Sequence, residues 1–208
     1  MTGPSRRERE RERHRDEVLG AAEAVFAEKG FAGATVQEIA TLADFAVGSL
    51  YNLFESKEDL YQRLMELRFQ EYFEQVEDRV HAAEGLREKV RAAIETKVGF
   101  FREHGAFFRI FSHAIGGRNS GAPQGLPEGC IAMCQRHMEA MAGIFAEGIG
   151  SGVFRPGDPM LIALAVDGMT NAMIGHTLFT GQELIDDATA GRLEDLLFHG
   201  ILREGGAE

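Results

Sequence analysis

The chain has 208 residues, 44% of them apolar, and a formal net charge of -11 from 22 Lys and Arg against 33 Asp and Glu. This length allows one or two small domains with a substantial core, and the apolar fraction is too high for a disordered protein. The acidic balance excludes nucleic-acid binding through bulk positive charge. No apolar run could cross a bilayer or serve as a signal peptide, so we expect a cytoplasmic protein with no membrane partner.

The N-terminal segment 5–16 alternates Arg with acidic residues and has no apolar face. One interpretation is a solvated, frayed helical extension whose opposite charges pair with one another. The other is a basic arm that reaches a groove or phosphates, with Arg6, Arg7 and Arg9 best placed. The first is favoured because charge runs are usually solvated. We assign residues 1–14 to this extension.

Apolar residues recur every three or four positions over 16–29, which predicts a helix that Gly30 ends. The segment 35–54 then contains two short apolar faces separated by a break at 43–46. Helices this short bury too little surface to be stable alone, so they must pack on a neighbour. The layout is a helix-turn-helix, whose second helix is shaped to enter a DNA major groove.

The rest of the chain also has helical periodicity. A long helix is predicted from Ser56, with Asp59 three residues on as a capping-box variant, to about residue 80. The segment 116–129 is dense in Gly and Pro and predicts an irregular loop. Strand alternation is absent, so the fold class is all-α. Further helices are predicted at 84–103, 105–115, 127–148, 157–180 and 188–203.

Three motifs in residues 15–61 occur in a specific order: AAxxxFxxxGF, TVxxIA and GSLYxxFxSKExL. On these motifs the segment resembles the DNA-binding domain of the TetR family of transcriptional regulators. The resemblance implies an N-terminal three-helix helix-turn-helix domain at 15–61. It also implies a long helix that joins this domain to a C-terminal helical domain at 62–208, which binds ligand and dimerises. Beyond residue 61 the chain is similar to the family only in helical layout and in a turn at 152–159.

The resemblance also implies which residues contact DNA. Gly48 would let the DNA backbone come close, and the hydroxyls of Ser49 and Tyr51 would donate hydrogen bonds. Lys57 would place a point charge on a phosphate beside a helix N-terminus. The expected DNA-contacting residues are Thr35, Val36, Ala46, Val47, Gly48, Ser49, Tyr51, Asn52 and Lys57.

The turn of the helix-turn-helix departs from the family's usual Gly-Val-Ser, because it reads Asp44-Phe45-Ala46. Asp tolerates the left-handed conformation better than most residues, so the turn is expected to survive. Phe45 is larger than the usual residue and is expected to shift the next helix. Ala46 has no hydroxyl to cap that helix, at a cost of about 1 kcal/mol.

Aromatic and Met side chains are frequent in the C-terminal helices. Core packing accounts for any one of them, but together they suit an adaptable apolar cavity. With the resemblance, they favour a small apolar or aromatic effector, with His137 or His176 as a polar contact. The expected ligand-binding residues are Phe101, Phe108, Phe111, Met133, His137, Met141, Met169, Met173 and His176.

Cys130, Cys134 and His137 share one face of a predicted helix at i, i+4 and i+7. They could bind a soft metal such as zinc. A structural site needs a fourth ligand, however, so reduced, buried thiols are the favoured interpretation. We expect no metal and no cofactor.

Small residues on the predicted helix 157–180 and leucines on the helix 188–203 suit close contact between helices. They favour a homodimer with an intersubunit four-helix interface made by these two helices. The alternative is that both faces belong to an intramolecular core.

Enzyme motifs such as GxxxxGK[ST], HExxH and GxSxG are absent, so we expect no enzyme.

The leading hypothesis is a homodimeric repressor, rather than an activator, that binds palindromic operator DNA. An effector would release it by binding the DNA-incompetent state more tightly. The alternative is a helical small-molecule or metal-binding protein whose helix-turn-helix no longer binds DNA. The net negative charge of the chain and the altered turn at Asp44-Phe45-Ala46 are the features that favour this alternative.

Overall fold

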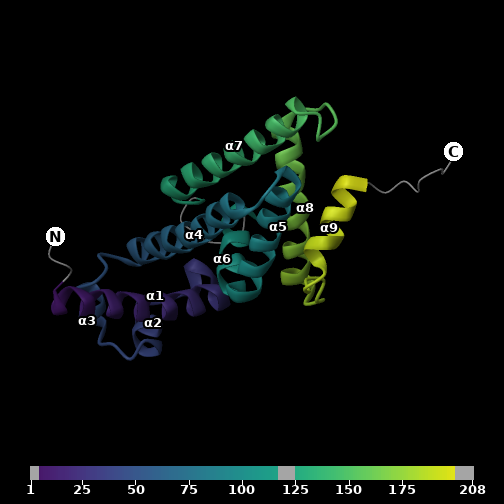
Figure 1. The fold of residues 1–208 in the computed structure, drawn as a ribbon. Helices are drawn as coiled ribbons and strands as arrows, with labels where there is room; N and C mark the ends of the chain where they lie inside the picture. Colours follow the sequence, from purple (N-terminus) through teal and green to yellow (C-terminus); the bar gives the residue numbers. More distant parts are fainter. Residues whose placement is uncertain (1–4, 117–124, 200–208) are drawn as a thin grey trace. The chain divides into compact units, whose positions relative to one another are not determined.

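The computed structural model describes residues 5–116 and 125–199. Within these ranges every regular element is a helix and no strand occurs, which confirms the all-α prediction. Part of the predicted loop and the end of the last predicted helix lie outside the described residues. The helices are α1 (Arg6–Gly33), α2 (Val36–Leu42), α3 (Val47–Tyr51), α4 (Lys57–Ala82), α5 (Leu86–Glu103), α6 (Gly105–Gly116), α7 (Glu128–Gly150), α8 (Pro159–Thr180) and α9 (Thr189–His199) (Figure 1).

Helix α1 begins ten residues before the predicted start, because the charged segment is helical and capped. Ser5 accepts a hydrogen bond from the Glu8 backbone N–H, and the Glu8 carboxylate accepts one from the Ser5 backbone N–H. Residues 5–17 are exposed except for the half-buried His14. The charged segment is therefore the first part of one continuous helix rather than a separate element.

Gly30 interrupts α1 where the sequence predicts its end. The backbone there has φ 69° and ψ 169°, a conformation that glycine adopts at little cost. The chain then completes one more turn to Gly33, and the Ala34 N–H donates to the Gly30 carbonyl at 3.1 Å. The predicted break is confirmed, but the helical segment continues past it in a new direction.

The chain divides into two compact units. The first comprises residues 1–69 and 106–131, and the second comprises 70–105 and 132–208. Helix α4 has residues in both units and runs unbroken past residue 61. The predicted division of the chain into 1–14, 15–61 and 62–208 stays a prediction.

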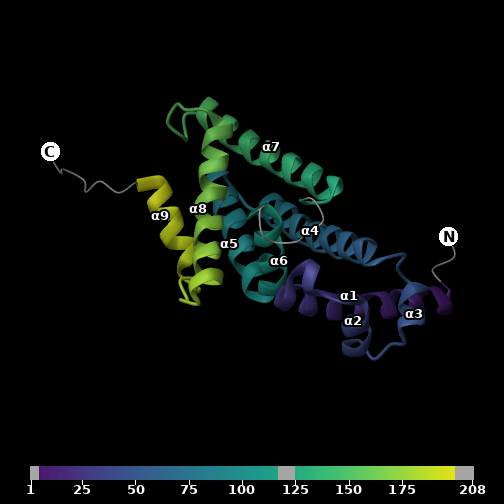
Figure 2. The same cartoon turned by 180° about the vertical axis from the view of Figure 1, so that it is seen from behind.

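The first unit is organised around an aromatic cluster at the end of α1. Phe26 contacts Phe31 with ring centroids 5.7 Å apart, and both rings contact Tyr61 of α4, at 5.6 and 5.2 Å. Helices α2 and α3 lie on one side of α1 (Figures 1 and 2). Ile39 of α2 and Leu50 of α3 are almost fully buried, so each short helix contributes one apolar anchor to the core.

A buried ion pair joins α1 to α4 within the first unit. The Arg68 Nε and Nη2 atoms donate to Oε2 of Glu23 at 2.9 and 2.7 Å, and the Glu23 side chain is buried. Two charge-assisted hydrogen bonds on one carboxylate are stronger than neutral ones. The pair therefore fixes the register of the two helices.

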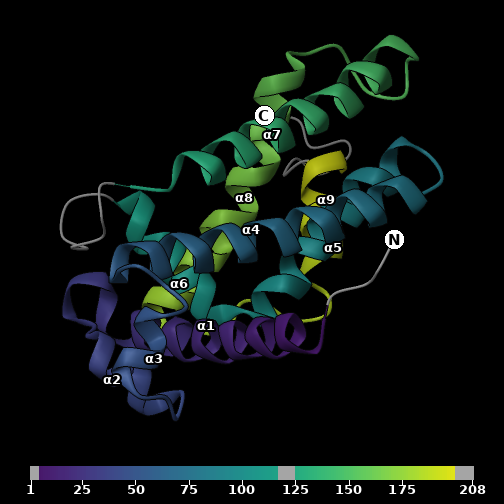
Figure 3. The same ribbon diagram turned by 90° about the vertical axis from the view of Figure 1, so that its left-hand side faces the viewer.

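In the second unit, α5 packs against α8 and α9, and α8 packs against α9 (Figure 2). The chain turns back between α7 and α8, as Figure 3 shows. In this turn the Phe154 ring lies over Gly148, where an added Cβ would be 2.0 Å from a ring carbon. Only glycine fits at position 148 without movement of the turn.

Arg68→Met should lower the free energy of unfolding by about 3 kcal/mol, because it leaves the Glu23 carboxylate buried without its partner. Arg63→Met is the matched control on the same helix. Arg63 is exposed and pairs with Asp59 at 3.4 Å and Glu66 at 4.0 Å, so its loss should cost less than about 1 kcal/mol. Urea denaturation followed by circular dichroism measures both variants, and equal costs would contradict the assignment.

Candidate DNA-binding surface and ligand cavity

Thr35 begins α2 with a capping box, as the resemblance implies. The Glu38 N–H donates to the Thr35 Oγ1 at 3.2 Å, and the Thr35 N–H donates to a Glu38 carboxylate oxygen at 3.0 Å. The turn after α2 places Asp44 at φ 59°, which confirms its left-handed conformation. Ala46 makes no side-chain cap on α3, so the predicted loss of a cap is confirmed.

One face of α3 is open to solvent. Gly48, Ser49, Tyr51 and Asn52 are exposed, whereas Leu50 is buried. Tyr51 is 52% exposed, and its hydroxyl hydrogen-bonds to no described residue. The predicted base- and backbone-contacting groups therefore share one accessible face on a helix anchored from behind.

The first half of α1 supports the C-terminal end of α3, which sequence reasoning missed. Arg11 donates to the Asn52 carbonyl at 3.3 Å, and Arg15 donates to the Leu53 carbonyl at 3.4 Å. Cations at a helix C-terminus satisfy its free carbonyls and the helix dipole. The i, i+4 spacing of the two arginines was the available signal. The arginines predicted for a basic arm are Arg6, Arg7 and Arg9, which precede these two.

The altered turn also contacts α1. The ring of His14 meets the ring of Phe45 edge-on with centroids 5.1 Å apart. The large residue in the turn therefore has a partner on α1, which accounts for the fold's tolerance of Phe at this position.

Lys57 has a structural role beside its expected one. Its Nζ donates to the carbonyls of Phe31 and Ala34 at 2.9 and 3.0 Å and lies 4.4 Å from the centroid of the Phe31 ring. An ammonium has three N–H donors, so one remains for a phosphate. The phosphate contact stays a prediction.

Glu38 is held as a carboxylate beside the candidate DNA surface. A hydrogen bond from Lys29 and further hydrogen bonds from Thr35 lower the pKa of Glu38 to about 2. Because Lys29 pairs with this charge, it offsets the repulsion that a lone carboxylate would exert on DNA phosphates.

The second unit contains a cavity of about 980 Å³ between α4, α5 and α7. Its size falls at the upper end of the range for small-molecule sites. Met133, His137 and Met141, three of the predicted ligand-binding residues, line it. The complete lining is Gln70, Phe73, Glu74, Val76, Glu77, Val80, His81, Ala83, Lys89, Met133, Arg136, His137, Ala140, Met141 and Ile144.

The other predicted ligand-binding residues do not line this cavity. Phe108 and Phe111 belong to a ring cluster around Phe107 in the first unit. His176 is exposed, with Nε2 3.3 Å from the amide oxygen of Gln182. The sequence identified these residues by their aromatic, Met or His side chains, which does not determine the space that each side chain faces. The remaining three, Phe101, Met169 and Met173, are buried or half-buried outside the cavity wall.

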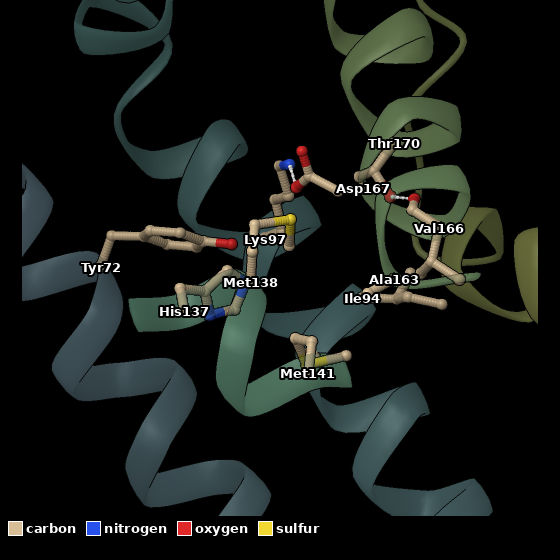
Figure 4. Close-up of a pocket in the computed structure, with 11 residues that line it drawn as sticks. Tyr72, Ile94, Lys97, His137, Met138, Met141, Ala163, Val166, Asp167 and Thr170 are labelled. Atoms are coloured by element: carbon tan, nitrogen blue, oxygen red, sulfur yellow. Dashed lines mark hydrogen bonds and ion pairs between the residues drawn. The ribbon is translucent and has the colours of Figure 1, made fainter. Parts of the chain in front are cut away.

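A cluster of buried polar groups surrounds a second cavity, of about 20 Å³ (Figure 4). Lys97 of α5 forms an ion pair with Asp167 of α8, and Asn171 donates to the other carboxylate oxygen of Asp167 at 2.7 Å. Tyr72 of α4 and His137 of α7 complete the polar part of the wall. Sequence reasoning missed this cluster, although Lys97 lies on the apolar face of its helix and Asp167 is the only Asp, Glu, Lys or Arg in α8.

Burial shifts the pKa values of two side chains of α7 near this cavity, His137 and Cys134. It lowers the pKa of His137, which favours the neutral imidazole, and it raises the pKa of Cys134 to about 11, so this thiol is protonated at neutral pH. A protonated thiol is a poor metal ligand. No group of three or more His, Cys, Asp or Glu residues that could hold a metal occurs in the described part of the chain.

No described helix is long and apolar enough to cross a membrane.

Comparison with known proteins agrees with the geometry of the first unit. Residues 18–64, which contain the capped α2, the left-handed turn and the exposed α3, match the family described as "Bacterial regulatory proteins, tetR family". Residues 18–64 therefore form a TetR-type DNA-binding domain. The predicted helix-turn-helix DNA-binding domain is therefore confirmed for these residues.

Similarity to TetR-family proteins extends beyond this domain. The chain is 23% identical over 186 residues to the "Fatty acid metabolism regulator protein" of Bacillus subtilis, covering 89% of this chain and 94% of that protein. The crystal structure of the regulator FadR from Bacillus subtilis in complex with stearoyl-CoA is 22% identical, with a TM-score of 0.76 over 90% of this chain and 99% of that one. The structure of AibR in complex with isovaleryl coenzyme A and operator DNA is 20% identical, with a TM-score of 0.72 over 89% and 98%. These structures show the fold.

The carboxyl group of Glu38 should titrate at about pH 2 in the folded protein and at a clearly higher pH in Lys29→Ala, where the largest cause of the shift is removed and only the hydrogen bonds from Thr35 remain. Because the folded pKa is depressed, the stabilisation by this carboxylate is present above the unfolded pKa and is lost as the pH falls towards 2. Carbon-detected NMR titration of the side-chain carboxyl measures both values. An unchanged pKa in Lys29→Ala would contradict the role of the ion pair.

Proposed function

We propose that this chain is a homodimeric TetR-family repressor that binds a palindromic operator through α3 and is released by an acyl-CoA thioester. The observation that carries the proposal is the exposed face of α3, held on a capped helix-turn-helix within residues 18–64. In such a complex the recognition helices of two subunits enter successive major grooves. This role would place the protein in the cytoplasm, as the sequence analysis expects.

The DNA contacts are proposed for the side chains on the α3 face and its flanks. Gly48 leaves the backbone open to a phosphate, and Ser49 and Tyr51 carry the hydroxyl donors. The chain is acidic overall, so affinity would depend on fit and on a few placed cations more than on bulk charge. The other expected contacts are Thr35, Val36, Ala46, Val47, Asn52 and the remaining N–H of Lys57.

The homodimer is supported by an apolar stripe on α8. Leu161 is 65% exposed and Phe179 is 75% exposed, and Leu164, Gly168 and Ala172 lie between them on the same helical face. Exposed apolar stripes of this length mark interaction sites. A two-fold axis would pair the stripe with its copy, and α9 lies beside α8 in the same unit.

The acyl-CoA effector is supported by the cavity and by the ligands named for similar structures, stearoyl-CoA and isovaleryl coenzyme A. The side chains of Phe73, Val76 and Met141 give the cavity an apolar wall suited to an acyl chain. Lys89 and Arg136 supply cations that could pair with the phosphates of coenzyme A.

Release of DNA requires that the effector bind the DNA-incompetent state more tightly than the DNA-bound state. Helix α4 provides a covalent link, since its first residues belong to the helix-turn-helix unit and its later residues line the cavity. A ligand that changes the position of α4 would change the spacing of the two recognition helices.

Gly48→Ala should weaken operator binding about tenfold or more, equal to about 1.4 kcal/mol, because the added methyl group holds the DNA backbone away from α3. The protein itself has room for that methyl group, since nothing lies within 4 Å of it. Its stability should be unchanged or rise by up to about 1 kcal/mol. A gel-shift titration on the palindrome nearest the chain's own gene, with and without dodecanoyl-CoA, measures affinity and release.

Gly143→Ala is the matched control, because Gly143 is an exposed helical glycine of α7 with equal room for a methyl group. This variant should bind the operator as the unaltered protein does. Equal affinity for Gly48→Ala, or no salt-sensitive shift on any palindrome, would oppose DNA binding through α3.

Gly168→Arg should convert the dimer to a monomer of 22.9 kDa, because it places a charged side chain in the middle of the α8 stripe. Nothing lies within 4 Å of an added Cβ at this position, so the fold itself should persist. Sedimentation equilibrium measures the mass, and Gly143→Arg, which should remain dimeric, controls for the substitution. A Gly168→Arg protein that remains dimeric would locate the interface elsewhere.

A further inference from the structure

The small cavity has a polar wall with unused hydrogen-bonding groups. Tyr72 and Lys97 are each only 7% exposed, and both face this cavity (Figure 4). Within the described residues the Tyr72 hydroxyl has no hydrogen-bond partner, and the Lys97 ammonium donates only to Asp167. Both groups lie on the wall of this cavity, so the Tyr72 hydroxyl and the two unused N–H groups of Lys97 are available to a ligand there.

The small cavity and the large cavity share part of their walls. His137 and Met141 of α7 line both of them. Met is flexible at three side-chain bonds, so a rotation of Met141 can open the wall without movement of the backbone. An acyl chain in the large cavity would then reach the polar groups of the small one.

The size of the small cavity limits what it can hold. Its volume of about 20 Å³ accommodates roughly one water-sized group. A single oxygen atom on a carbon chain fits this space. A longer stretch of hydrocarbon does not fit, and it would leave Tyr72 and Lys97 without partners.

The charges around the small cavity favour a neutral oxygen. Lys97 and Asp167 compensate one another, and burial favours the neutral form of His137. A carboxylate would add an unpaired negative charge next to Asp167, which burial makes unfavourable. A hydroxyl or a ketone oxygen can accept from Tyr72 Oη and from Lys97 Nζ without this penalty.

We propose that the effector carries a hydroxyl or ketone oxygen on its hydrocarbon part, and that this oxygen occupies the small cavity between Tyr72 and Lys97. The inference rests on the proposed acyl-CoA function and narrows it from saturated acyl chains to oxygenated ones. Tyr72 and Lys97 then determine specificity, because a site built to hydrogen-bond an oxygen rejects the analogue that lacks it.

Isothermal titration calorimetry of the full chain tests this with dodecanoyl-CoA and with a set of monohydroxylated dodecanoyl-CoAs whose hydroxyl lies on successive carbons. At least one hydroxylated compound should bind about tenfold or more tightly than dodecanoyl-CoA. In Tyr72→Phe this preference should disappear. Tyr61→Phe is the matched control, since it removes a tyrosine hydroxyl that likewise has no partner, but in the first unit. This variant should keep the preference.

The outcomes separate the two proposals. If dodecanoyl-CoA binds the unaltered protein as tightly as every hydroxylated compound does, the preference for an oxygenated chain is wrong. The proposed acyl-CoA function then still stands. This outcome needs no variant, because it is measured on the unaltered protein. A preference that survives in Tyr72→Phe, or that Tyr61→Phe also loses, overturns the inference as well. If no coenzyme A thioester binds, both the acyl-CoA function and the inference fail.

Discussion

The position of the recognition helix depends on its support by α1. Helix α3 has five residues and no side-chain cap at its start, so it cannot persist alone. Leu50 anchors it in the core, and Arg11 and Arg15 satisfy carbonyls at its end. The exposed face of α3 is therefore held in place by side chains that do not belong to that face, namely Leu50, Arg11 and Arg15.

The same contacts explain how a chain with a net negative charge can present a helix-turn-helix suited to DNA phosphates. Two arginines of the charged segment, Arg11 and Arg15, bring positive charge to the C-terminal end of α3. Lys29 neutralises Glu38 at the start of α2, and Lys57 holds the end of α1 to α4. Local pairs thus set the charge at this surface, whereas most of the net negative charge lies in the second unit, which has 19 Asp and Glu against 10 Lys and Arg, compared with 14 against 12 in the first.

Sequence periodicity predicted most helices and the backbone breaks at Gly30 and Asp44, because these features depend on neighbouring residues. It could not predict contacts between residues far apart in the chain. Arg15 meets a carbonyl 38 positions away, and Lys97 meets Asp167 70 positions away. The frequency of aromatic and Met residues likewise placed both Phe108 and Met133 among the expected ligand-binding residues, but in the fold Phe108 contacts an aromatic cluster and Met133 lines the cavity.

The buried polar cluster of the second unit has a cost that folding alone does not explain. An ion pair such as Lys97–Asp167 is often no more stabilising than apolar residues of similar volume. The Tyr72 hydroxyl makes no hydrogen bond to a described residue, so Phe would pack in its place without loss of a contact. A ligand that supplies an oxygen gives Tyr72 and Lys97 hydrogen bonds that the protein alone does not. These polar groups therefore favour ligands that carry an oxygen atom, because only such a ligand completes their hydrogen bonds.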